Sequence, residues 1–352
     1  METIHTLTDL LVNSGCQYHI YDISRRVQLI DNEQFAAVER ASQPYPYPIQ
    51  RQAQFAIAYW NEEKQPWIWF LKFQLDERGL LSQGDVGQFL KYVLEAMGTR
   101  LGKEMSEEQQ QKLSNNPFTF KPTDDKLAVF HSLLRAELDL TTSQYYQHAR
   151  DYFRGDLGWD NWQTVGLQGI TDMAARLGQE ENGRLIRTSL RHLASEPRYA
   201  LLGALEHVAL PEKLSTTLRE LAQFECESDE PDLFLLAAYA RALSGGKPEQ
   251  LESLVSEILA SARLSHQEVL IAIAGRAWQP LTTPALAEKF LVRLAQTGNQ
   301  GLFNQLFADL VMMPSLRLVL LPLLHSSPSP ELASALVALQ QAATQGKNSL
   351  GR

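Results

Sequence analysis

The feature that most constrains this 352-residue chain is the regular spacing of helical patterns in its second part. From Asp124 onward, apolar residues recur at helical intervals between short Gly, Pro and Ser breaks, and no segment alternates as a strand does. The first helices of five successive pairs are expected to start 33 to 36 residues apart, near Trp162, Arg198, Pro231, His266 and Asn299. A strand-free period of this length is typical of an α-solenoid. We therefore predict an all-α, HEAT-like helical-repeat domain over residues 124–345, with a compact helical bundle as the alternative.

The first hundred residues follow the two-residue period of β-strands instead. Alternating segments at 17–23 and 27–30 are separated by the turn Ser24-Arg25-Arg26, and a hairpin turns at residues 61–66. Helical patterns are present at residues 3–13, 31–41 and 85–97. These patterns predict a small α+β domain over residues 1–101, with a four-stranded antiparallel sheet and covering helices. A polar linker containing a short helix is expected at 102–123, and a disordered tail at 346–352.

The return strand of the hairpin is apolar on both of its faces. Trp67, Trp69 and Phe73 share one face, which the helix at 85–97 is expected to cover. Ile68 and Phe70 lie on the other face, which must also be buried. We predict that this second face docks onto the helical repeat, and a binding partner is the alternative.

Composition narrows the functional classes. Hydrophobic residues make up 44% and charged residues 21% of the chain, as in ordinary globular proteins, and the net charge of −9 disfavours a broad grip on nucleic acid or anionic lipid. The start of the chain lacks the pattern of a signal peptide, and no apolar run reaches the ~20 residues of a membrane span. We therefore expect a cytoplasmic protein. Cys16 and Cys226 fall in different predicted domains and are expected to be reduced thiols.

No motif points to a reaction. The sequence has no His-Glu-x-x-His or paired Cys-x-x-Cys, so we expect no metal site and no cofactor. Gly245-Gly246-Lys247 follows a helix instead of a strand and has Pro248 where a phosphate loop carries Ser or Thr, which favours a helix end and turn. An enzymatic activity is left open, and nothing in the sequence favours one.

Two groups of residues remain as weak binding candidates. Arg184, Arg187 and Arg191 fall on one face of a predicted helix, where they either form a solvated surface or bind an anionic partner. Trp159 and Trp162 belong to an aromatic cluster with two aspartates. HEAT-like DNA glycosylases use Trp and Asp in a groove of this kind, whereas a packed cap of the repeat is the structural alternative.

Three segments carry a resemblance that spans most of the chain: Ile4-His-Thr-Leu-Thr-Asp-Leu-Leu11, Tyr21-Asp-Ile-Ser-Arg-Arg26 and Pro66-Trp-Ile-Trp-Phe-Leu-Lys-Phe73. The chain resembles an uncharacterised family of γ-proteobacterial proteins of unknown function, which implies a bacterial cytosolic setting but supplies no activity or catalytic residues to carry over. We expect a non-enzymatic adaptor that binds a protein partner through its helical-repeat surface. The alternative is a nucleic-acid-binding or nucleic-acid-processing protein that uses a basic groove of the repeat.

Overall fold

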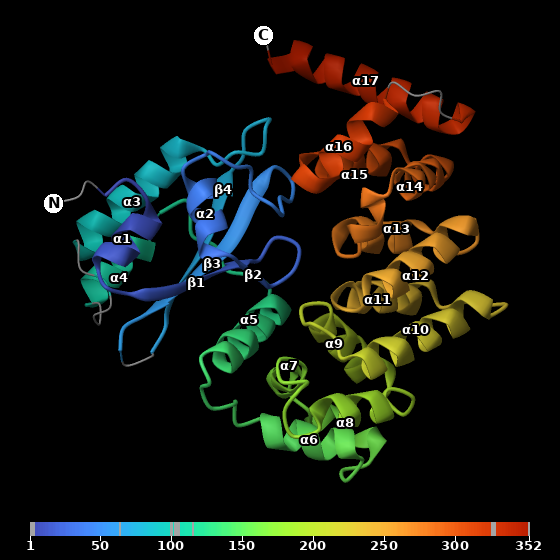
Figure 1. Cartoon of the computed structure of the whole chain (residues 1–352), viewed down its shortest axis with the longest axis horizontal. Coiled ribbons are helices and arrows are strands. Elements are labelled where there is room, and N and C mark those ends of the chain that lie inside the picture. The colour runs from blue at the N-terminus through green and yellow to red at the C-terminus, as the bar shows by residue number, and fades with distance from the viewer. Residues whose placement is uncertain are drawn as a thin grey trace. The chain divides into compact units, whose positions relative to one another are not determined.

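A four-stranded antiparallel sheet in the order β2-β1-β3-β4 organises the N-terminal part of the chain (Figure 1). The computed structural model describes residues 4–62, 65–98, 101, 106–114, 116–324 and 329–350. Its strands are β1 (Gln17–Asp22), β2 (Gln28–Ile30), β3 (Gln52–Trp60) and β4 (Trp67–Gln74). Because Ile57 pairs with Trp69 and Phe55 with Leu71, the apolar side chains of both strands gather on the same face. The predicted α+β class and antiparallel sheet are confirmed.

Helices from four segments cover that face of the sheet. They are α1 (Leu7–Asn13), α2 (Asn32–Glu39), α3 (Gln83–Met97) and α4 (Glu107–Ser114). Trp69 and Phe73 are buried with Phe89 of α3 in one core, as the alternating pattern predicted. The first three helices start at side-chain caps, Thr6, Asp31 and Ser82, whose oxygens accept backbone N–H groups of the first turn. The first helix therefore starts at Leu7 instead of residue 3.

The opposite face of the sheet is covered by α5 (Asp124–Glu137). The Phe130 ring of this helix meets Tyr21 edge-on at 5.2 Å between ring centroids and Phe70 at 5.0 Å. The half-buried Phe70 ring also contacts Phe120, and Ile68 on the same face is half-buried. The face of Ile68 and Phe70, which the sequence predicted to dock onto the helical repeat or a partner, is therefore packed against α5.

The division into compact units follows from this packing. One unit comprises Met1–Asp139 with Met312–Pro314, and the other comprises Leu140–Val311 with Ser315–Arg352. The chain was expected to divide within the polar segment 102–123. Leu113 and Phe118 of that segment are instead buried in the core of the first unit, and α5 also belongs to this unit. The segment contributes a packed helix, and the division falls after Asp139.

The turn between β1 and β2 is built around the buried carboxylate of Asp22. This carboxylate accepts the backbone N–H groups of Ser24, Arg25 and Arg26 and, at 2.7 Å, the hydroxyl of Tyr45. The buried Arg25 donates from Nε to the carbonyl of Pro48 at 2.9 Å. On the other side, Lys126 of α5 donates to the carbonyls of Ile23 and Ser24 at 2.5 and 2.8 Å. The turn thereby links both strands to α5 and to the proline-rich segment before β3.

Replacing Trp69 by Ala should reduce the free energy of unfolding of the first unit by about 3–5 kcal/mol, because a large buried ring leaves a cavity. Urea unfolding followed by circular dichroism measures this loss. Ile68→Ala, on the half-buried opposite face, is the matched control and should cost clearly less. A loss below about 1 kcal/mol for Trp69→Ala would show that Trp69 does not anchor this core.

The second unit is helical throughout its described residues, and residues 140–324 and 329–350 contain no strand. Its α-helices are α6 (Tyr146–Arg154), α7 (Leu167–Ala174), α8 (Asn182–Ser189), α9 (Ser195–Leu205), α10 (Glu212–Glu227), α11 (Leu233–Ala242), α12 (Pro248–Ala260), α13 (Gln267–Gly275), α14 (Pro284–Gln296), α15 (Gln300–Met312), α16 (Pro314–Leu323) and α17 (Pro330–Leu350). Short 3₁₀ turns lie at η1 (Trp159–Thr164), η2 (Leu243–Gly245) and η3 (Gln279–Thr282). Residues 346–350, expected in a disordered tail, continue α17, whereas 351–352 lie outside the described residues.

Successive helices form two layers. In one layer α7, α9, α11 and α13 pack against each other in order, and α8, α10, α12 and α14 do so in the other (Figure 1). The helices α7, α9, α11, α13 and α15 correspond to the predicted first helices of the pairs. The largest difference is at Trp162, which lies in the 3₁₀ turn η1, so that the first of these helices begins five residues later, at Leu167.

Ion pairs and hydrogen bonds connect residues at equivalent positions of successive repeats. Buried Glu206, at the end of α9, accepts from Arg241 of α11 at 3.1 Å and from Arg276, after α13, at 3.0 Å. These three residues follow each other at intervals of 35. Arg263 and Arg293 donate to carbonyls at the C-terminal ends of α10 and α12, where the helix dipole favours a positive charge.

Replacing Glu206 by Gln should lower the free energy of unfolding of the helical unit by about 2–4 kcal/mol, because two partly buried guanidinium groups lose their anionic partner. Far-UV circular dichroism in increasing urea measures the change. Glu212→Gln removes an exposed ion pair with Lys247 that also spans 35 residues, and this control should leave the transition in place. Equal effects of both variants would contradict a special role for the buried carboxylate.

Candidate functional site

The three candidate arginines do not form one helical stripe. Arg184 and Arg187 lie on α8, but this helix ends at Ser189, and Arg191 lies in the turn beyond it. Arg184 forms an ion pair with Glu181 at 2.7 Å, next to a left-handed backbone conformation at Glu181 (φ 63°). The prediction of one shared helix face is wrong for Arg191, because the helix is too short, and Arg184 has a local partner.

The triple variant Arg184→Ala, Arg187→Ala and Arg191→Ala tests the nucleic-acid alternative. We expect the wild type and the variant to behave alike in fluorescence anisotropy with labelled single- and double-stranded DNA and RNA at about 150 mM salt. A phosphate-binding surface would instead give a slope of log affinity against log salt that flattens by about one unit per lost contact. Binding at physiological salt that disappears in the triple variant would favour the nucleic-acid alternative.

The predicted aromatic cluster is brought together only in part. Trp159 lies in η1, where its ring stacks on His192 at 5.2 Å and meets Tyr152 edge-on at 5.6 Å. The Tyr152 hydroxyl donates to the carbonyl of Trp159 at 3.1 Å, which fixes the 3₁₀ turn against α6. Trp162 is half-buried in the same turn. The contacts of Trp159 are thus made with neighbouring segments of the repeat itself.

A hollow of about 490 Å³ opens on the layer of α9, α11 and α13, and we call it the repeat hollow. It is lined by Tyr199 from α9, by Asp232, Phe234, Ala237 and Arg241 from the cap and body of α11, and by Glu268 from α13. The Asp232 carboxylate caps α11 by accepting the N–H of Leu235 at 2.9 Å, which places Phe234 in the first turn. The hollow therefore spans three successive repeats.

Phe234 is the most unusual residue of the repeat hollow. Phe234 is 62% exposed, whereas large apolar side chains of the repeat are mostly buried between the layers. A second exposed aromatic residue, Phe224 near the end of α10, precedes the acidic segment 225–232, and Phe234 follows that segment. Exposed aromatic rings next to a concavity are typical of protein-binding surfaces.

The charged side chains Arg241 and Glu268 of the repeat hollow differ in whether they are already paired. Arg241 is bound to the buried Glu206, whereas the Glu268 carboxylate has no hydrogen bond or ion pair within the described residues. Burial, together with the nearby Asp232 carboxylate, raises the pKa of the Tyr199 phenol, so its hydroxyl stays protonated and can donate. The surface thus combines an exposed ring with an available carboxylate.

Sequence reasoning missed the repeat hollow, although a signal was present. Tyr199 and Phe234 are 35 residues apart and occupy equivalent places in successive repeats, as Glu206 and Arg241 do. Superimposing the repeats at this interval would have placed aromatic and charged residues together on one layer.

The described part of the chain shows neither a metal site nor a membrane-spanning helix. No group of three or more His, Cys, Asp or Glu side chains within it is arranged to hold a metal ion. Among its helices, none combines the length and the apolar character needed to cross a membrane.

The fold and the repeat hollow define the class of the protein: a small α+β domain joined to a helical repeat with a surface hollow. Residues 2–340 match the family model described as "Protein of unknown function (DUF3549)", and the chain belongs to this family. The resemblance to an uncharacterised family is thereby confirmed. Searches of curated proteins and of solved structures found no match to the chain.

Proposed function

We propose that this protein is a non-enzymatic adaptor of the bacterial cytoplasm that binds a protein partner through the repeat hollow. The exposed Phe234 ring on the wall of this hollow is the observation that supports the proposal. Burying such a ring in a partner would remove a large apolar area from water, and aromatic residues of this kind dominate the binding energy of many interfaces.

The charge of the surface indicates which partner fits. Asp232 and Glu268 line the hollow, and further carboxylates of the segment 225–232 lie before α11 in the chain. A partner segment that presents an apolar side chain beside Lys or Arg complements this surface. Phosphate groups of nucleic acid would be repelled by the same carboxylates, which disfavours the nucleic-acid alternative at this site.

Replacing Phe234 by Ala should weaken binding of the partner about thirtyfold or more, which corresponds to a loss of about 2 kcal/mol or more at an interface centre. The partner is first identified by affinity capture with the wild-type protein and mass spectrometry. Its dissociation constant is then measured with purified proteins by isothermal titration calorimetry.

Leu318→Ala provides the matched control, because Leu318 is 81% exposed on α16 and does not line the hollow. Glu268→Lys should weaken binding and reverse its dependence on salt if the partner segment is basic. Equal affinities of the Phe234→Ala variant and the wild type would place the interface elsewhere and contradict the proposal.

A further inference from the structure

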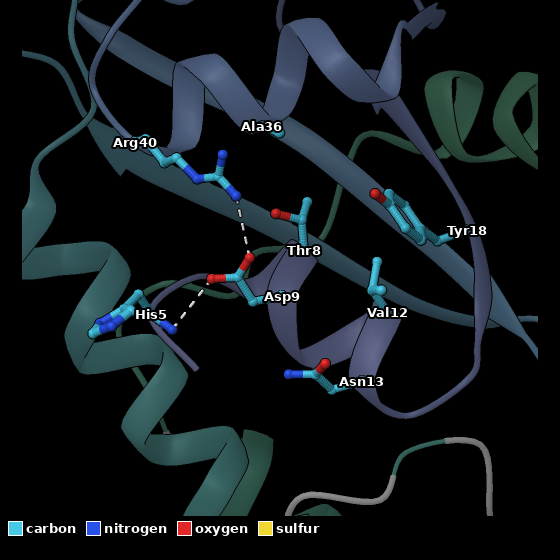
Figure 2. A pocket seen from close by; sticks show the side chains of 8 residues that line it. All are labelled: His5, Thr8, Asp9, Val12, Asn13, Tyr18, Ala36 and Arg40. Atoms are coloured by element: carbon cyan, nitrogen blue, oxygen red, sulfur yellow. Dashed lines mark hydrogen bonds and ion pairs between the residues drawn. The ribbon is translucent and has the colours of Figure 1, made fainter. Parts of the chain in front are cut away.

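A second hollow lies in the first unit, between α1, β1 and α2, and we call it the α1–α2 hollow (Figure 2). It has a volume of about 560 Å³, within the ~300–1,000 Å³ typical of small-molecule sites. The lining side chains are His5, Thr8, Asp9, Val12, Asn13, Tyr18, Ala36 and Arg40. This hollow belongs to a different unit from the repeat hollow, so its occupant is independent of the proposed protein partner.

A buried carboxylate, that of Glu39, joins the two helices that line the α1–α2 hollow. Glu39, the last residue of α2, accepts the backbone N–H of Leu7 at 2.7 Å and that of Thr8 at 3.2 Å. It also accepts the Thr8 hydroxyl at 2.7 Å. Because these bonds tie α1 to α2, and Thr8 lines the hollow, its shape is already formed without a ligand.

Several polar groups in this hollow have no partner within the described residues. The imidazole of His5, the amide of Asn13 and the hydroxyl of Tyr18 make no hydrogen bond there. Arg40 makes one contact, from Nη2 to Oδ1 of Asp9 at 3.3 Å, and its remaining N–H groups have no acceptor in the same part of the chain. Figure 2 shows the Arg40 and Tyr18 side chains on either side of Thr8.

The available groups are mainly hydrogen-bond donors. Guanidinium, amide and phenol groups donate, and the imidazole donates from at least one nitrogen, so the complementary ligand group is rich in acceptors. The carboxylate of Asp9 already accepts from Arg40 and from the N–H of His5, which offsets its negative charge inside the hollow. The Tyr18 ring and the side chains of Val12 and Ala36 add apolar surface for a ligand body.

We propose that the α1–α2 hollow binds a small organic oxyanion, a carboxylate or a phosphate monoester with a planar or aliphatic body. Arg40 holds the oxyanion, and the body lies against Tyr18 and Val12. The affinity of a small probe is expected to be modest, because Arg40 is 60% exposed and its charge is partly screened by water.

The test uses benzoate and phenyl phosphate as probes, with benzyl alcohol as the uncharged counterpart, in isothermal titration calorimetry of the full chain. We expect saturable binding of at least one oxyanion with a dissociation constant below about 1 mM, and none of benzyl alcohol. The two charged probes distinguish a carboxylate site from a phosphate site.

Arg40→Gln should weaken the binding about tenfold or more, and Tyr18→Phe, which keeps the ring, should weaken it a few-fold. Arg78→Gln is the matched control, because Arg78 is also exposed, at 77%, and also pairs with an aspartate, Asp76, at 3.4 Å. Its affinity should equal that of the wild type. No saturable binding of either oxyanion up to about 10 mM, or equal affinities of the Arg40→Gln and Arg78→Gln variants, would overturn the proposal.

Discussion

The buried carboxylate of Asp22 holds the turn on which the first unit depends. Burial raises the pKa of this carboxyl group, and the hydrogen bonds from Tyr45, Ser24 and Arg25 offset part of that cost of desolvation. The turn fixes how β1 pairs with β2, and a slip of one residue would send every side chain of a strand to the opposite face. Within the motif Tyr21–Arg26, which carries part of the family resemblance, Asp22 is the residue whose side chain this turn requires, because Ser24, Arg25 and Arg26 donate to it from their backbone N–H groups.

Much of the architecture could be predicted because the two periodicities of the chain are physical requirements. Alternation around Ile57 and Trp69 can be satisfied only by a sheet with one face against a core, and the narrow stripes of the later helices require neighbouring helices. The role of α5 could not be read in this way. Its pattern is that of any amphipathic helix, and helical periodicity does not say whether the buried stripe faces a sheet or another helix.

The candidate sites were harder to predict, because they depend on where helices end and on which residues remain exposed. The arginine pattern assumed a helix through Arg191, whereas α8 ends at Ser189. Phe234 appeared in the sequence as one more apolar residue of a helix, and only the packing of α11 shows that its ring is left outside the core. Arg40 follows α2 and Tyr18 belongs to β1, so their placement on one hollow depends on tertiary structure that no local pattern encodes.

The link from Glu206 to Arg241 and Arg276 has a consequence for how the repeat opens. In a linear array, each repeat normally senses only the next one, and local fraying can then spread or stop at any boundary. One carboxylate that binds both of the following repeats couples next-nearest neighbours as well. Opening of α9 would break both bonds to Glu206, and opening of α11 or α13 would break one of them, so these three helices should open as one cooperative block. The same three helices form the walls of the repeat hollow, which is thereby kept in a single shape before any partner arrives.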